Sequence, residues 1–202
     1  MLAGYLIGTL SPSAFIAKLK KDDLRKRGTG NLGATNVTMV YGRLLGVLVM
    51  IFDIMKGFTV FKVSEFIAPE VLSNNIPIVG LLASGCAVIG HIFPFYLKFK
   101  GGKGFASYFG MTLALNWKFA LVIALLIFLA TVITDYIVAG TTLTIVTVLV
   151  YLGIAEHSVL LALILCVATM VILYKHRVNY VRIWNGTEIG LRSVMKGKHR
   201  VT

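Results

Sequence analysis

The chain has 202 residues, of which 57% are hydrophobic and only 14% are charged, and its formal net charge is +12 at pH 7. A soluble domain of this size carries more charge, and the long uncharged apolar runs disfavour a nucleic-acid partner, which the net charge alone would suggest. The composition therefore indicates an integral membrane protein whose basic residues face anionic lipid headgroups and anionic substrates.

The first apolar run, Leu2 to Ala17, begins with no basic residue before it, whereas a signal peptide carries its positive charge first. Basic residues instead follow it, concentrated between Lys18 and Arg27. Because cytoplasmic loops of membrane proteins are enriched in lysine and arginine, we expect this loop in the cytoplasm and the N-terminus outside.

A loop is predicted at Gly28 to Asn36, which reads GTGNLGATN and contains no hydrophobic face. The next apolar run, Val40 to Val60, is predicted to span the membrane and contains Asp53 and Lys56. These two residues are three apart and share a helix face, which favours a structural ion pair inside a bundle. Lys62 to Asn75 is expected to be an outside loop.

The rest of the chain alternates between apolar runs and polar loops in the same way. The number of spans depends on Phe105 to Leu115, which is short for a full crossing. That segment is a tilted or re-entrant helix, or it fuses with the next span. The other expected spans are Ile76 to Tyr96, Phe119 to Thr134, Tyr136 to Gly153 and Ser158 to Tyr174.

A turn at Glu156 and His157 is expected outside, and the basic tail from Lys175 to Arg200 in the cytoplasm. The sequence thus predicts an all-α bundle of about seven transmembrane helices, forming one domain over residues 1–202. Five or six crossings remain possible if short segments only dip into the membrane.

Three polar segments fall on the cytoplasmic side of this topology. The first is the turn at Gly101, Gly102 and Gly104 around Lys103, where glycine lets backbone N–H groups approach an anion and a helix starting near Gly104 adds its dipole. It is not a nucleotide P-loop, because Leu97 stands where that motif needs glycine. The alternative is a flexible basic loop at the lipid headgroups.

The loop at Gly28 to Asn36 is the second segment, and Asn31, Thr35 and Asn36 donate hydrogen bonds without repelling a phosphate. An ordinary surface loop is the alternative there. The third segment, Lys175 to Glu188, reads KHRVNYVRIWNGTE.

In this third segment His176, Asn179 and Arg182 follow one another at helical spacing, although basic residues after a span also serve as headgroup anchors. His91, at a helix end before Pro94, is most simply a structural histidine bonded to the neighbouring loop.

No metal or cofactor is expected, because the four histidines do not cluster at metal-ligand spacing and the two cysteines lie in apolar runs. A transporter for a phosphorylated solute would place polar residues deeper in the spans. A structural subunit that binds anionic lipid would not need clustered glycines.

The three polar segments resemble the three signature motifs of the PlsY family, the bacterial acyl-phosphate:glycerol-3-phosphate acyltransferases. GTGNLGATN resembles the first motif, GHIFPFYLKFKGGKGFAS the second and KHRVNYVRIWNGTE the third. Asp53, Lys56 and Gly57 also match the family's D-x-x-K-G. Thr29 stands where serine is common, and Met39 stands where many members have arginine, with Arg43 a few residues on.

This resemblance implies transfer of a fatty acyl group from acyl phosphate to the first hydroxyl of sn-glycerol 3-phosphate, giving lysophosphatidic acid and phosphate. It implies a monomer in the bacterial inner membrane with its site facing the cytoplasm. The His-x4-Asp dyad of other glycerolipid acyltransferases is missing, since the fifth residue after each testable histidine is Tyr96, Ala162 or Val181.

Under this resemblance, Lys103 and the Gly101 and Gly102 backbone would hold one phosphate, and the loop from Asn31 to Asn36, helped by Thr29, would hold the acyl-phosphate head. Arg43, Thr141, His176 and Asn179 would orient glycerol 3-phosphate. A substrate phosphate oxygen would take the hydroxyl proton, with His176 as the rival general base. The acyl chain would lie between spans. The further binding candidates are Gly30, Gly33, Ala34, Thr35, Asn36, His91, Gly104, Arg182 and Glu188.

Overall fold

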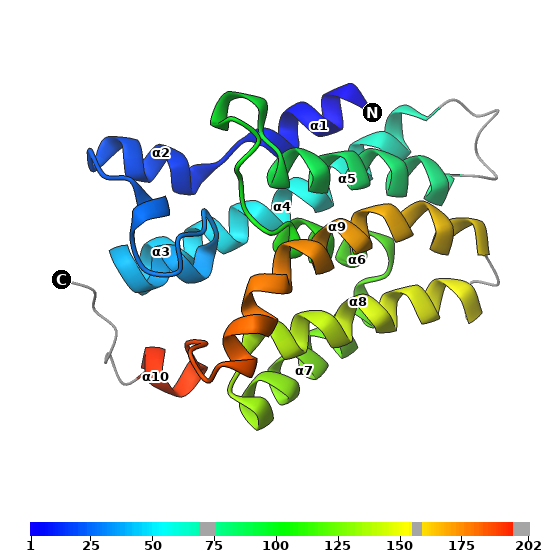
Figure 1. The fold of residues 1–202 in the computed structure, drawn as a ribbon. Helices are drawn as coiled ribbons and strands as arrows, with labels where there is room; N and C mark the ends of the chain where they lie inside the picture. The colour runs from blue at the N-terminus through cyan, green and yellow to red at the C-terminus, as the bar shows by residue number, and fades with distance from the viewer. Residues whose placement is uncertain (69–75, 155–158, 196–202) are drawn as a thin grey trace. The chain divides into compact units, whose positions relative to one another are not determined.

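The computed structural model describes residues 1–68, 76–154 and 159–195, and every regular element in these ranges is a helix (Figure 1). Two compact units divide them, the first Met1–Leu115 and the second from Asn116 onward. The first unit contains α1 Leu2–Thr9, α2 Pro12–Leu19, η1 Leu24–Lys26, α3 Ala34–Tyr41, α4 Arg43–Ile67, α5 Ile76–Ile92, η3 Phe95–Leu97 and α6 Phe105–Leu115. The second contains α7 Trp117–Thr134, α8 Ile137–Ile154, α9 Val159–Trp184 and α10 Leu191–Met195.

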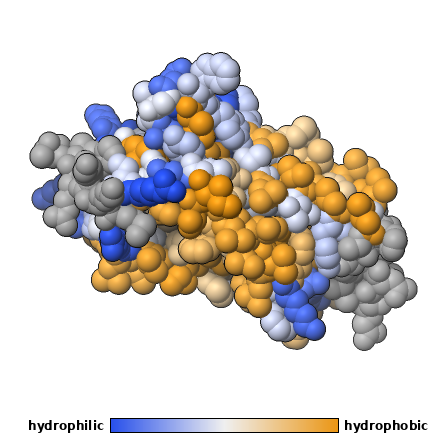
Figure 2. Space-filling model, turned by 90° about the horizontal axis from the view of Figure 1, so that it is seen from below, coloured by the Kyte–Doolittle hydropathy of each residue, from blue (hydrophilic) through white to orange (hydrophobic). Residues whose placement is uncertain are grey.

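Five segments among the described residues are long and apolar enough to cross a membrane. They are Leu2–Leu19, Arg43–Ile67, Ile78–Leu97, Trp117–Thr134 and Ile137–Ile154. Their outward side chains are largely apolar: in α7, Leu121, Leu125 and Phe128 are each more than half exposed. Hydrophobic side chains accordingly cover much of the surface in Figure 2. The membrane bundle is confirmed, while seven spans and the orientation stay predictions.

The first span is broken, although the sequence predicted one continuous run from Leu2 to Ala17. Leu10 and Ser11 are extended between α1 and α2, and Pro12 opens α2. Proline lacks the N–H that would continue the helix, and the Ser11 side chain caps the new helix by accepting from Ala14 N at 3.3 Å.

Close contacts between backbones join α1 to α5, which pack side by side (Figure 1). A Cβ on Gly4 would lie 2.4 Å from the Ala83 carbonyl oxygen, and one on Gly8 would lie 2.1 Å from that of Ala87. Small residues allow helices in a membrane to approach until their backbones touch. This interface therefore depends on the missing side chains.

The pair α4 and α6 is packed in the same way. A Cβ on Gly57 would lie 1.9 Å from the Ser107 carbonyl oxygen, and one on Gly110 would lie 1.9 Å from that of Ile54. The buried Ser107 hydroxyl donates to the Asp53 carbonyl oxygen at 2.9 Å. This contact seats the N-terminal half of α6 against the middle of α4.

Two predicted boundaries near the first motif are wrong. The loop at Gly28 to Asn36 ends earlier, because α3 begins at Ala34. The span predicted at Val40 to Val60 starts later: α3 ends at Tyr41, and Gly42, with φ +100°, separates it from α4.

The predicted outside loop at Lys62 to Asn75 also starts too early. Helix α4 continues to Ile67, and the ion pair between Lys62 Nζ and Glu65 Oε2 at 2.8 Å lies on this helix. Helix-compatible charged pairs at this spacing cannot be told from loop residues by composition alone. The remainder of that loop and the turn at Glu156 and His157 lie outside the described residues.

Helices α6 and α7 are separate, so of the two alternatives for Phe105 to Leu115 the fusion with the next span is wrong. Asn116 is extended between them, and its side-chain oxygen caps α7 by accepting from Phe119 N at 3.0 Å. Helix α9 continues beyond the predicted end of its span at Tyr174, and reaches Trp184.

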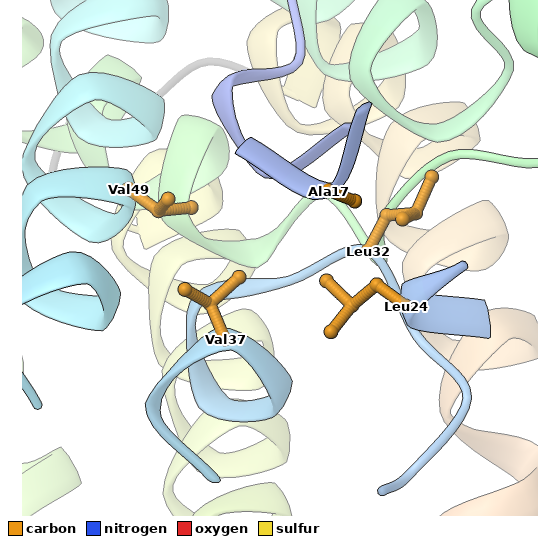
Figure 3. Packing of buried hydrophobic residues seen from close by; sticks show 5 residues of the cluster. All are labelled: Ala17, Leu24, Leu32, Val37 and Val49. Carbon is orange, nitrogen blue, oxygen red and sulfur yellow. The ribbon is translucent and has the colours of Figure 1, made fainter. Parts of the chain in front are cut away.

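A small hydrophobic cluster lies under the first motif (Figure 3). It joins α2, η1, the loop, α3 and α4 through the buried side chains of Ala17, Leu24, Leu32, Val37 and Val49. Apart from α4, each of these elements is too short or too polar to fold alone, so the cluster fixes where the loop and the start of α3 lie.

Candidate active site

The glycine turn of the second motif is hydrogen-bonded to the end of α5. Gly101 N donates to the Ile92 carbonyl oxygen at 3.0 Å, and Gly102 N donates to that of His91 at 3.1 Å. The sequence predicted that these two N–H groups would hold a phosphate. Here both groups satisfy carbonyls that the helix end leaves without partners, and the phosphate-binding role of the two glycines stays a prediction.

The glycines are instead required for close approach. A Cβ on Gly101 would lie 2.2 Å from the His91 carbonyl oxygen, and one on Gly102 would lie 2.1 Å from His91 Nε2. The Gly102 backbone thus lies against the imidazole ring. His91 is in contact with the neighbouring loop, as the sequence predicted.

Lys103 follows this anchored turn and is half-buried. Gly104 has φ +88°, a conformation that glycine adopts without strain, and α6 begins at Phe105. The predicted helix start near Gly104 is confirmed. The Lys103 ammonium and the first N–H groups of α6 are therefore neighbours in the chain, and both favour an anion.

Behind the turn, three ionisable side chains are buried together. Lys56 Nζ lies 2.9 Å from Asp53 Oδ1 and 2.9 Å from His91 Nδ1, and His91 Nδ1 lies 3.3 Å from Asp53 Oδ1. The predicted ion pair of α4 is confirmed. That His91 joins it could not be read from the spacing of residues 35 positions apart.

The first motif is organised by one side chain. Asn36 is fully buried, and its Oδ1 accepts from Thr29 N at 2.7 Å. Its Nδ2 donates to the carbonyl oxygens of Leu24 at 3.0 Å, Arg27 at 3.1 Å and Asn31 at 2.9 Å. These bonds give Asn36 the role of shaping the loop around it.

The other residues of this motif lie around the start of α3. Gly33 is the N-cap residue and Ala34 the first helical residue, while Thr35 in the first turn is exposed. Gly30 has φ +74° and is exposed. The first N–H groups of α3 have no partners within the helix, so this end of α3 is suited to an anion.

An ionic group supports the same region. Arg27 Nη1 lies 2.9 Å from Asp22 Oδ2, and the Tyr41 hydroxyl donates to the same oxygen at 3.0 Å. The hydrogen bond from Arg27 holds the pKa of Asp22 below its usual value. Burial, and then Asp22, raise the pKa of Tyr41 to about 12. Arg43 is exposed at the first position of α4, shortly after Tyr41.

In the second unit, α8 packs against α9. Thr141 is buried in the first turns of α8, and its hydroxyl donates to the Ile137 carbonyl oxygen at 3.1 Å. The next residue, Thr142, is hydrogen-bonded through its hydroxyl to that of Tyr180 at 2.7 Å. This bond links the start of α8 to the C-terminal part of α9.

The third motif begins inside α9, so His176 and Asn179 lie on one continuous helix. His176 and Asn179 are each only 7% exposed. After Trp184 the chain reverses, and the N–H groups of Thr187 and Glu188 donate to the Arg182 carbonyl oxygen at 2.8 and 3.1 Å. Asn179 Nδ2 donates to Glu188 Oε1, so the returning chain fixes the amide of Asn179.

Asp135, at the turn between α7 and α8, binds the segment that comes after the third motif. Its carbonyl oxygen accepts from Leu191 N at 2.7 Å, and its Oδ1 accepts from Arg192 N at 2.8 Å. Arg192 Nη2 also donates to the Val132 carbonyl oxygen at 3.1 Å. No local pattern in the sequence predicts this contact, because Asp135 and Arg192 are 57 positions apart.

Comparison with known proteins identifies the family. The family model described as glycerol-3-phosphate acyltransferase matches residues 1–186. The chain belongs to this family. A glycerol-3-phosphate acyltransferase of Lactiplantibacillus plantarum is 36% identical over 93% of this chain and 88% of its own length. The glycerol-3-phosphate acyltransferase 2 of Bacillus anthracis is 38% identical over 93% of this chain and 95% of its own length.

Two solved structures of the acyltransferase family have the same fold. Both are described as PlsY (YgiH), an integral membrane glycerol 3-phosphate acyltransferase, one in its glycerol 3-phosphate form and one in its lysophosphatidic acid form. The first is 30% identical with a TM-score of 0.86, and the second is 31% identical with a TM-score of 0.76. Each comparison covers 96% of this chain and 95% of the other.

The acyltransferase motifs are thus placed separately within the two units. The first unit brings His91 against the turn before Lys103, and brings Thr29, Asn31 and Asn36 together. In the second unit Asn179, Glu188 and Arg182 are joined as described above. No group of three or more His, Cys, Asp or Glu side chains that could hold a metal ion occurs within the described residues.

Proposed function

We propose that this chain transfers a fatty acyl group from acyl phosphate to the sn-1 hydroxyl of glycerol 3-phosphate, giving lysophosphatidic acid and phosphate. This is the first step of bacterial phospholipid synthesis. The glycine turn carries the proposal: it is anchored on α5 and presents Lys103 directly before the N-terminus of α6. Membership of the acyltransferase family supplies the acceptor.

The two substrates both carry phosphate, so two anion-binding regions are needed. Lys103 and the start of α6 hold one phosphate, and the start of α3 with Thr29 and Asn31 holds the acyl-phosphate head. Three residues act through the backbone that they shape: Asn36, Gly101 and Gly102. The Asn36 side-chain amide and the two glycine N–H groups are hydrogen-bonded to the protein itself.

The second unit supplies residues that orient the acceptor. We assign this role to Thr141, His176 and Asn179, together with Arg43 of the first unit, and we treat residues 1–202 as one catalytic domain. Glu188 fixes the Asn179 amide, so that its remaining hydrogen-bonding atoms keep one direction. The enzyme acts as a monomer in the inner membrane, with its site facing the cytoplasm.

The transfer is direct. The glycerol hydroxyl oxygen attacks the acyl carbon, the bond from that carbon to the phosphate oxygen breaks, and phosphate leaves with the bonding electrons. A substrate phosphate oxygen takes the hydroxyl proton. Because the donor is already activated, positioning and electrostatic stabilisation supply the rate, and no covalent enzyme intermediate forms.

Incubating the purified protein in vesicles with labelled glycerol 3-phosphate and palmitoyl phosphate tests this function. We expect the label in lysophosphatidic acid. Label that crosses the vesicle membrane unchanged would indicate a transporter, and label that does neither would leave a structural role. In the same assay His176→Gln, which keeps hydrogen bonding but removes basicity, should retain most activity; a complete loss would favour His176 as the general base.

A further inference from the structure

The buried lysine of α4 has more partners than an ion pair needs. Besides Asp53 Oδ1 and His91 Nδ1, Lys56 Nζ donates to the carbonyl oxygens of Gly8 at 3.1 Å and Leu10 at 2.8 Å. An ammonium group has three N–H bonds and no acceptor. Lys56 therefore uses its three hydrogens on Gly8, Leu10 and His91, and it pairs with the Asp53 carboxylate by charge, all within the first unit.

Two of these acceptors come from the break in the first span. Where α1 stops, the carbonyls of Gly8, Thr9 and Leu10 have no helical N–H donor, because Pro12 has no N–H to give to Gly8 and the helix is interrupted at Leu10 and Ser11. Tyr96 donates to the Thr9 carbonyl oxygen at 2.6 Å, and Lys56 donates to the other two. In the apolar core of a bilayer such carbonyls must be satisfied by protein, so Lys56 holds the break closed.

The remaining acceptor connects the cluster to the glycine turn. Since an ammonium can only donate, His91 Nδ1 must accept from Lys56, and the hydrogen of a neutral ring then lies on Nε2. Nε2 is the atom against which the Gly102 backbone lies. Lys56 thus fixes both the orientation of the imidazole and the tautomer that it presents to the turn.

We infer that Asp53 and Lys56 are positioning residues for the phosphate site at Lys103. They lie behind His91 and make no contact with substrate. They act by holding the imidazole ring against which the Gly102 backbone packs. This inference rests on the proposed function, in which Lys103 binds the phosphate of a substrate. If the contact between the His91 ring and the Gly102 backbone is lost, Lys103 is displaced and glycerol 3-phosphate binds more weakly. The chemistry of bound substrate is unchanged.

The test compares an apolar pair with its single variant. Lys56→Met leaves the buried Asp53 carboxylate without its cation, so its melting temperature should fall furthest. Asp53→Leu combined with Lys56→Met removes both charges, and the melting temperature should partly recover. In this double variant we expect the KM for glycerol 3-phosphate to stay raised about tenfold, the scale of one lost hydrogen bond to a charged group. The value of kcat should change less than about twofold.

Phe61→Leu is the matched control, because Phe61 is fully buried in the same helix and packs beside Gly80, away from the turn. It should lower the melting temperature without changing KM. Asp53→Asn keeps the side-chain shape and provides a second variant should the double variant fail to fold. It should raise KM about threefold, since the Lys56 cation loses its counter-charge.

A double variant with wild-type KM and recovered melting temperature would make the cluster purely structural and overturn the inference, as would wild-type KM in Asp53→Asn. Lys103→Ala is measured alongside. If Lys103→Ala is inactive while the double variant keeps wild-type KM, only the inference fails. If Lys103→Ala keeps wild-type kcat and KM, the proposed phosphate site fails and the inference fails with it.

Discussion

The sharpest stability prediction concerns Asn36, whose amide joins four points of the first motif. Asn36→Ala removes two N–H donors and one acceptor from a fully buried position. Each lost hydrogen bond costs about 1 kcal/mol, and the buried Leu24 carbonyl left without a donor adds about 1 kcal/mol more. We therefore expect the free energy of unfolding to fall by about 4 kcal/mol, or about 10 °C in melting temperature.

Asn36→Asp separates donation from acceptance. The carboxylate still accepts from Thr29 N, but it faces three carbonyl oxygens without a hydrogen to donate. This variant should be at least as unstable as Asn36→Ala. The exposed neighbour Thr35 provides the control, since Thr35→Ala should change the free energy of unfolding by less than about 0.5 kcal/mol.

Thermal unfolding in detergent, followed by intrinsic fluorescence and by loss of activity, measures all three variants. If Asn36→Ala unfolds at the wild-type temperature, the amide does not hold the loop, and the reasoning from these four contacts is refuted. An Asn36→Asp variant as stable as the wild type would have the same consequence.

Three further outcomes are expected. Gly110→Ala should destabilise the protein by about 2 kcal/mol, because its Cβ would lie 1.9 Å from the α4 backbone; Gly85→Ala, with open space around it, should be neutral or stabilising in the same melting assay. The folded protein should keep the Tyr41 proton between pH 10, its usual pKa, and about 12. The contribution of the protonated Tyr41 hydroxyl to stability is therefore complete below pH 10 and is lost as the pH rises through 12. Absorbance titration of the wild type against Tyr41→Phe measures the pKa of this hydroxyl. Replacing Asp22 by alanine should lower this pKa without restoring the usual value, since burial is the larger cause. Asp135→Gly should speed tryptic cleavage of the tail, because the carboxylate that accepts its backbone N–H is lost; an unchanged cleavage rate would contradict this role.

The sequence predicted the class of fold and the helix start after the glycine turn because both depend on local properties. Apolar runs of sufficient length indicate spans wherever they occur. The spacing of Asp53 and Lys56 predicted their pairing. The spacing of His176 and Asn179 places them on one helix face, provided that the helix continues past the span. The predicted helix at Phe105 followed from the glycines before it.

Contacts between distant segments could not be predicted in this way. Nothing local indicates that Gly101 and Gly102 donate to the end of α5, because a glycine turn can face either an anion or a neighbouring backbone. The same limit applies to His91 beside Lys56. Pro12 was the available signal for this cluster: inside an apolar run it breaks a helix and leaves carbonyls that a buried donor must satisfy.

The identity of the acyl donor tests the central claim most directly. The purified protein is assayed with glycerol 3-phosphate and, in turn, palmitoyl phosphate, palmitoyl-CoA and palmitoyl-acyl-carrier protein, while lysophosphatidic acid and released phosphate are both measured. We predict activity with palmitoyl phosphate alone, with one phosphate released for each lipid formed. An equal kcat/KM with either thioester donor would contradict the account, because a site built for two phosphates would then not be needed.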